Sequence, residues 1–131
     1  MADIRRVTPD FAVAPQLAAE DLAEAKVQGF TLVINNRPDA EVPDQPTSAE
    51  MRTAAEAYGL KYVHIPVVGR PNEGQVKAVA EAVAAAEGPV LAFCRSGTRS
   101  IVTWSLGQTG RPREELIRLG QAAGYDLSGA V

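Results

Sequence analysis

Short apolar runs alternate along the chain with longer segments in which apolar residues recur at helical spacing. The runs are rich in β-branched and aromatic residues, which is typical of strands buried on both faces. Three of them predict central strands, over 30–34, 60–65 and 90–93. A fourth run, over 11–14 before Pro15, predicts an edge strand.

The segments between these runs predict helices. The segment 18–28 places its apolar residues on one helical face and is followed by Gly29, which favours a helix end. Thr47 and Glu50 have the spacing of a capping box at the start of a second helix. Further helices are expected from residue 72 or 73 to the Gly88-Pro89 break, over 98–106 and over 112–123.

This alternation of strands and helices predicts an α/β fold of three layers, with a mainly parallel central sheet and helices on both faces. In such sheets, ligands bind at the carboxyl ends of the strands. Three connections leave those ends, over 35–46, over 66–72 and directly after Phe93. We therefore expect the functional site among these three connections.

Composition excludes several classes of protein. At 131 residues, the chain is long enough for one core and too short for two, so we expect a single domain over residues 1–131. A net charge of −3 without a basic stripe indicates no attraction to nucleic acid. One cysteine cannot form an internal disulfide, which suits a reducing compartment. Because no apolar run approaches a membrane span or a signal peptide, we expect a cytoplasmic protein that binds no membrane.

The only cysteine, Cys94, follows the strand over 90–93 and precedes a short loop and a helix. Successive N–H groups of such a loop form an anion-binding nest, and the helix start adds unpaired N–H groups and a positive dipole. We therefore expect Cys94 to be a thiolate nucleophile and Arg99 to bind an oxyanion above the sulfur through two N–H groups. The residues expected to contact the substrate are Arg95, Ser96, Gly97, Thr98 and Ser100.

Each of these side chains also has a simpler interpretation. Ser100 either donates to the thiolate or caps the helix start. Ser96 and Thr98 either face the substrate or supply turn hydroxyls only. Arg95 either attracts anionic substrates or is a solvated charge.

Two residues outside the loop are candidates for the same site. Arg37 and Asp39 follow a predicted strand end, and Asp39 is the candidate general acid. The alternative is an Arg37–Asp39 pair that only holds the loop. Glu73 is more simply a helix-dipole partner, and His64 a core or edge histidine. One cysteine and one histidine do not make a typical transition-metal site, so we expect no metal and no cofactor.

Four ordered segments carry a resemblance to a known family. They are Val33-Ile-Asn-Asn-Arg-Pro-Asp39, Tyr62-Val-His-Ile-Pro-Val67, Gly88-Pro-Val-Leu-Ala-Phe-Cys-Arg-Ser-Gly-Thr-Arg-Ser100 and Gly124-Tyr-Asp-Leu127. Together they resemble the bacterial phosphatase-like domain of beta-lactamase-hydrolase-like proteins. That resemblance implies a fold similar to the dual-specificity phosphatases. It also implies phosphatase or sulfurtransferase activity, with a persulfide-dioxygenase-like metallohydrolase as functional partner.

The site loop departs from the phosphatase pattern. Four residues separate Cys94 from Arg99, one fewer than in the protein tyrosine phosphatases, and the loop resembles that of the rhodaneses, which carry a sulfane sulfur on cysteine. Gly69 stands where those phosphatases place an acid, and Phe93 where they commonly have histidine. An alkyl phosphate needs an acid to protonate its leaving group, whereas sulfite leaves thiosulfate unaided.

These departures favour sulfur transfer. We expect a sulfurtransferase that carries a persulfide on Cys94, with a thiosulfate- or glutathione-persulfide-class donor and a thiol acceptor. The alternative is a cysteine-dependent phosphatase acting on a small oxyanion substrate. A third interpretation, a silent anion-binding module, fits the intact pair of Cys94 and Arg99 less well.

Overall fold

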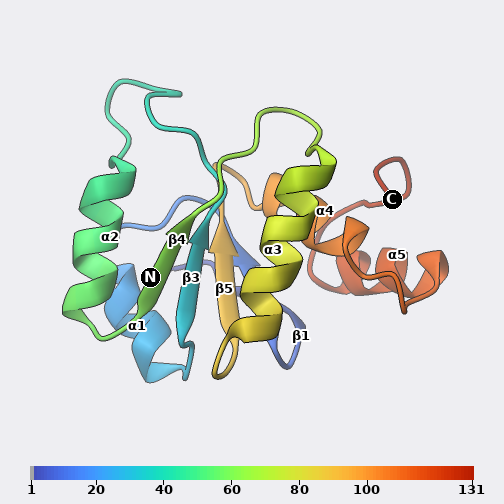
Figure 1. The fold of residues 1–131 in the computed structure, drawn as a ribbon, viewed down its shortest axis with the longest axis horizontal. Helices are drawn as coiled ribbons and strands as arrows, with labels where there is room; N and C mark the ends of the chain where they lie inside the picture. Colours follow the sequence, from blue (N-terminus) through green and yellow to red (C-terminus); the bar gives the residue numbers. More distant parts are fainter. Residues whose placement is uncertain (1) are drawn as a thin grey trace.

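A computed structural model describes residues 2–131 and shows five strands in one sheet, with helices on both faces (Figure 1). The strands lie in the order β1-β2-β5-β3-β4. Only the β1–β2 pair is antiparallel, and the other pairs are parallel. The strand bounds are β1 Arg5–Thr8, β2 Phe11–Ala14, β3 Leu32–Asn35, β4 Lys61–His64 and β5 Val90–Phe93. The expected α/β fold with a mainly parallel sheet is confirmed.

Five helices cover the sheet. Their bounds are α1 Asp21–Val27, α2 Ser48–Ala57, α3 Glu73–Ala85, α4 Thr98–Leu106 and α5 Arg113–Ala122. The expected capping box is present at α2, where Thr47 and Glu50 each accept a backbone N–H from the other. Asn72 and Gln75 form a second capping box at α3. None of the helices over residues 2–131 has both the length and the apolar character needed to cross a membrane.

The two faces of the sheet bury two separate cores, because successive residues of a strand point to opposite sides. On β5, Leu91 and Phe93 pack in the core under α1 and α2, whereas Val90 and Ala92 pack in the core under α3, α4 and α5. All four residues of β5 are buried. The apolar run over 90–93 is therefore explained by a central strand covered on both faces.

The segment Phe11–Ala14 is not an edge strand, and that prediction is wrong. It forms β2, which is completely buried between β1 and β5. The edge strand next to β2 is β1, an antiparallel strand that was not predicted from the sequence because its arginines hide the apolar pattern. Only Pro9 and Asp10 separate β1 from β2, a pair typical of a turn.

The three connections expected to form the functional site meet at the carboxyl ends of the parallel strands. In Figure 1 the connections over 36–47 and 65–72 rise above the ends of β3 and β4, at the edge where β5 also ends. The backbone N–H of Asn36 donates to Phe93 O at 2.8 Å, and that of Val67 to Asn36 O at 2.9 Å. The sheet thus brings the three expected connections together.

Candidate active site

Cys94 is buried at the end of β5, and its sulfur accepts a hydrogen bond from the loop that follows. The backbone N–H of Gly97 donates to Sγ at 3.1 Å. Gly97 has φ +93°, a conformation that side-chain-bearing residues rarely adopt, and it is the N-cap of α4. The loop thus places a backbone N–H donor directly against the sulfur.

Arg99, in the first turn of α4, extends its guanidinium across the site. Nη1 donates to Glu41 Oε2 at 2.7 Å and to Val67 O at 2.8 Å, and Nη2 donates to Glu41 Oε1 at 2.8 Å. These bonds use three of the five N–H groups of a guanidinium. Nε–H and the second Nη2 hydrogen take no part in these three bonds and could form a fork for an oxyanion close to Cys94. The hydrogen bonds with Glu41 are the main reason that the pKa of Arg99 is raised, and nearby Cys94 adds to the rise.

Glu41 is a site residue that the sequence analysis did not single out. Its carboxylate binds Arg99 at two points and also accepts from Nε of Arg37 at 2.9 Å. The hydrogen bonds from Arg99 are the main cause that lowers its pKa from 4.5 to about 2. Burial opposes this effect, and the hydrogen bond from Arg37 adds a smaller lowering. Glu41 is therefore ionised at neutral pH and unsuited to protonate a leaving group. It is a positioning residue that holds Arg99.

Arg37 lies behind Glu41. Its side chain is only 5% exposed, and its Nη1 donates to Gln16 Oε1 at 3.0 Å. The backbone of Arg37 is fixed as well, because its N–H donates to Asn35 Oδ1 at 2.8 Å and its carbonyl is hydrogen-bonded to His64 Nε2 at 2.8 Å. Arg37 thus supports the carboxylate that orients Arg99, and His64 has a structural partner.

Asp39, the candidate general acid, instead binds the start of α2. Its Oδ1 accepts the backbone N–H of Ser48, the first residue of α2, at 2.7 Å. The alternative Arg37–Asp39 pair is wrong, because Arg37 pairs with Glu41 four residues further along the loop. Gly69, at the expected acid position, lies exposed in the loop over 65–72. Among residues 2–131, no hydrogen bond therefore joins Asp39 or any other carboxyl group to Cys94.

The remaining loop side chains have local roles. Ser96 Oγ donates to Thr98 Oγ1 at 3.0 Å and accepts the Thr98 N–H at 3.3 Å, a turn in which the two hydroxyls engage each other. Arg95 is exposed. Ser100 makes neither of its expected hydrogen bonds, because its Oγ is buried without a partner in the part of the chain described. The helix starts instead at Gly97, which has no capping side chain.

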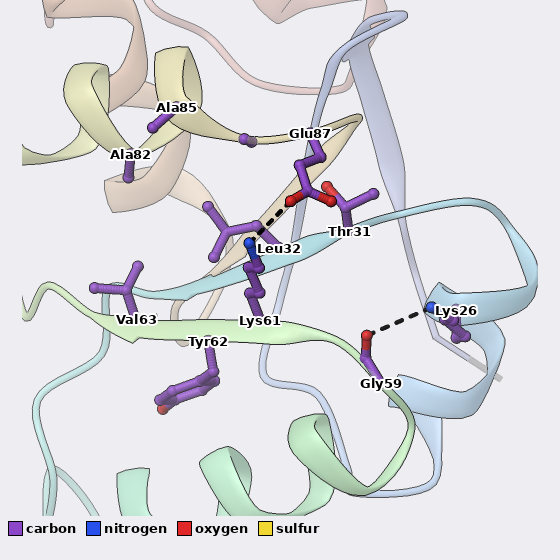
Figure 2. A pocket seen from close by; sticks show the side chains of 11 residues that line it. Lys26, Thr31, Leu32, Gly59, Lys61, Tyr62, Val63, Ala82, Ala85 and Glu87 are labelled. Atoms are coloured by element: carbon purple, nitrogen blue, oxygen red, sulfur yellow. Dashed lines mark hydrogen bonds and ion pairs between the residues drawn. The ribbon is translucent and has the colours of Figure 1, made fainter.

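A pocket of about 400 Å³ lies at the opposite end of the sheet (Figure 2). It is bounded by the starts of β3 and β4 and by the end of α3, and its lining does not include Cys94 or Arg99. Both of its lysines are engaged, Lys61 with Glu87 at 3.1 Å and Lys26 with Gly59 O at 3.4 Å. This pocket is therefore separate from the candidate site at Cys94. Within residues 2–131 no three metal-ligating side chains gather to hold a metal ion.

Comparison with known proteins gives a consistent result. The family model "Beta-lactamase hydrolase-like protein, phosphatase-like domain" matches residues 3–111. A beta-lactamase hydrolase-like protein of Agrobacterium fabrum is 37% identical in an alignment 130 residues long that covers 96% of this chain. The chain spans only 30% of the length of that relative.

Solved structures agree in fold. A candidate phosphatase of Neisseria meningitidis is 33% identical, with a TM-score of 0.87, over 96% of this chain and 92% of its own. TpbA of P. aeruginosa, solved in complex with phosphotyrosine, is 17% identical with a TM-score of 0.70, over 94% of this chain and 75% of its own. The second likeness shows the fold alone.

Proposed function

Since the chain belongs to the phosphatase-like domain family of beta-lactamase hydrolase-like proteins, we propose that it is a cysteine-dependent phosphatase-like hydrolase with Cys94 as its nucleophile. One observation carries the proposal: Glu41 holds Arg99 beside Cys94 through the two Nη atoms, so the Nε edge of the guanidinium lies outside the ion pair. A planar fork next to a thiolate suits a tetrahedral oxyanion whose central atom the sulfur attacks.

The reaction has two steps in this proposal. The Cys94 thiolate attacks the phosphorus of a bound phosphate monoester, forming an S–P bond while the P–O bond to the leaving group breaks with its electron pair. Water then attacks the phosphorus, the S–P bond breaks, and inorganic phosphate leaves with the thiolate restored. Arg99 binds the phosphoryl oxygens in both steps, and its charge offsets the negative charge that develops there.

The site favours leaving groups that depart without a proton. Glu41 is ionised, Asp39 accepts the Ser48 N–H, and Gly69 has no acid to offer. Expulsion of an alkoxide needs general-acid help, whereas a more acidic phenol leaves readily as its anion. We therefore propose aryl phosphates as the substrate class.

Sulfur transfer is the second candidate, favoured by the same lack of an acid and by the four-residue spacing from Cys94 to Arg99. Here the thiolate attacks the outer sulfur of thiosulfate, an S–S bond forms, and sulfite leaves with the electron pair. A thiol acceptor then removes the outer sulfur from Cys94, and a persulfide-dioxygenase-like metallohydrolase would consume the product. Sulfur transfer is the activity expected first from the sequence alone, but the family and its solved relatives support phosphatase activity better.

Side-by-side kinetics separate the two. We expect kcat/KM for an aryl phosphate to exceed that for thiosulfate with cyanide or for glutathione persulfide, and Cys94→Ser to abolish turnover. Intact mass after a rapid quench should show one phosphoryl group on the wild-type chain and none on Cys94→Ser. A stable gain of one sulfur with poor phosphate turnover would replace the phosphatase proposal with sulfur transfer. If Cys94→Ser retains activity, both the phosphatase and the sulfur-transfer proposals are refuted.

A further inference from the structure

Tyr125, in the segment that follows α5, contacts the site loop. Its hydroxyl donates to the carbonyl oxygen of Ser96 at 2.9 Å. The same peptide unit contains the N–H of Gly97, which donates to Cys94 Sγ at 3.1 Å. The carbonyl and the N–H of a trans peptide point in opposite directions. A hydroxyl that binds the carbonyl therefore fixes the direction in which the N–H points.

The fit between Tyr125 and Gly97 is close. A methyl group on Gly97 would collide with the Tyr125 hydroxyl and would come within 3.4 Å of the Ala14 backbone. Glycine is thus required here for space as well as for its φ of +93°. Glycine also makes the peptide easy to rotate, because its backbone tolerates many conformations. An outside contact is needed to keep one orientation of the Ser96–Gly97 peptide.

The ring of Tyr125 is itself held in place. Its backbone N–H donates to Gly120 O at 2.8 Å, and the guanidinium of Arg5 lies 5.6 Å from the ring centroid. Arg5 Nη1 also donates to Ala123 O at 2.9 Å, so strand β1 and the end of α5 frame the tyrosine. Burial raises the pKa of Tyr125, with a smaller contribution from nearby Cys94, so its hydroxyl is a proton donor at neutral pH.

We propose that Tyr125 is a positioning residue that orients the Ser96–Gly97 peptide so that the Gly97 N–H points at Cys94 Sγ. Without the hydroxyl, this peptide is free to turn, and a turned peptide presents its carbonyl oxygen to the sulfur. A carbonyl dipole disfavours the thiolate that the N–H favours. The role assigned to Tyr125 rests on the proposed function only in taking Cys94 as the nucleophile.

The test is the pH dependence of Cys94 alkylation by iodoacetamide, measured without substrate. Tyr125→Phe removes one oxygen and keeps the ring. We expect the midpoint of the alkylation profile to move up by about one pH unit, because a hydrogen bond to a charged group is lost. The matched control is Tyr58→Phe on an exposed tyrosine at the end of α2, which should leave the midpoint in place. An unchanged midpoint in a folded Tyr125→Phe protein overturns the proposal.

A second measurement needs no variant. In ¹⁵N-labelled wild-type protein, the amide proton shift of Gly97 should follow the same pH profile as the alkylation, since that proton points at the sulfur. If the amide proton shift of Gly97 does not change as Cys94 ionises, the assigned orientation of the peptide is refuted. This holds even if Tyr125→Phe fails to fold. The acid limb of kcat/KM should move with the alkylation midpoint, an effect that simple loss of packing does not produce. These outcomes are independent of whether Cys94→Ser retains turnover, which tests the proposed function instead.

Discussion

Glu41 and Arg99, 58 residues apart in the chain, form a two-point ion pair with oxygen–nitrogen distances of 2.7 and 2.8 Å. The pair joins the loop after β3 to α4, the helix that follows the Cys94 loop in the chain. Because both Glu41 oxygens bind Nη atoms, the Nε edge of Arg99 stays outside the ion pair. In the proposed function, Glu41 would thereby orient Arg99 toward the substrate without contacting the substrate itself.

Replacing Glu41 should therefore weaken oxyanion binding. Glu41→Gln removes the charge and one of the two acceptor oxygens, so Arg99 loses its fixed orientation. Hydrogen bonds to charged groups contribute about 1.5–3 kcal/mol, so we expect kcat/KM to fall roughly ten- to a hundredfold. The inhibition constant for vanadate should rise in parallel. Glu87→Gln, the same change at the opposite end of the sheet, is the control. Wild-type vanadate affinity in Glu41→Gln would contradict the positioning role.

Acid should weaken the fold in part through the same carboxylate. The pKa of Glu41 falls from 4.5 to about 2 in the folded chain, mainly because of Arg99. A lowered pKa in the folded state adds stability that is fully present above pH 4.5 and is lost as the pH falls toward 2. Urea unfolding of wild type and Glu41→Gln across that window should show the free-energy difference between them shrinking. A difference that stays constant would mean that the ion pair adds nothing to stability.

Charge alone should not replace the guanidinium. Arg99→Lys keeps the positive charge but provides a point donor that cannot bind Glu41 at two positions and an oxyanion through a fork as well. We expect a loss of roughly a hundredfold or more in kcat/KM for an aryl phosphate, corresponding to about 3 kcal/mol. Arg118→Lys, on the exposed side of α5, is the matched control. Equal kinetics of Arg99→Lys and wild type would show that Arg99 only holds Glu41 in place.

Asp39 should matter for stability and not for turnover. Asp39→Asn keeps Oδ1 as acceptor for the Ser48 N–H, so we expect kcat/KM within about twofold of wild type, inside the usual scatter of surface changes. Asp39→Ala loses the acceptor at the start of α2 and should lower the free energy of unfolding by about 0.5–2 kcal/mol. Thermal or urea unfolding measures the second effect. Should Asp39→Asn abolish turnover and remove the basic limb of the pH profile, Asp39 would be the general acid after all.

Features that depend on neighbours in the chain could be predicted from the sequence. The helix over 98–106 and its start after the Cys94 loop agree with α4, because a glycine in a short loop and an apolar helical face are local signals. The capping box of Thr47 and Glu50 is equally local, since its two hydrogen bonds span one helical turn. The order of strands and helices indicated the layers, and the layers placed the site at the strand ends.

Contacts between distant segments were decided only by the tertiary structure. Nothing near Glu41 distinguishes it from Asp39 or Asp44 in the same acidic loop, and only folding brings Glu41 to Arg99. From the sequence, Tyr125 is noted only as part of the segment Gly124–Leu127, which contributes to the family resemblance. Its contact with Ser96 joins positions 29 residues apart and depends on the fold. The sequence by itself places Cys94, Arg99 and the loop that joins them together, because they lie within six consecutive residues. The groups that orient them come from other loops, and their roles follow from which strands lie side by side.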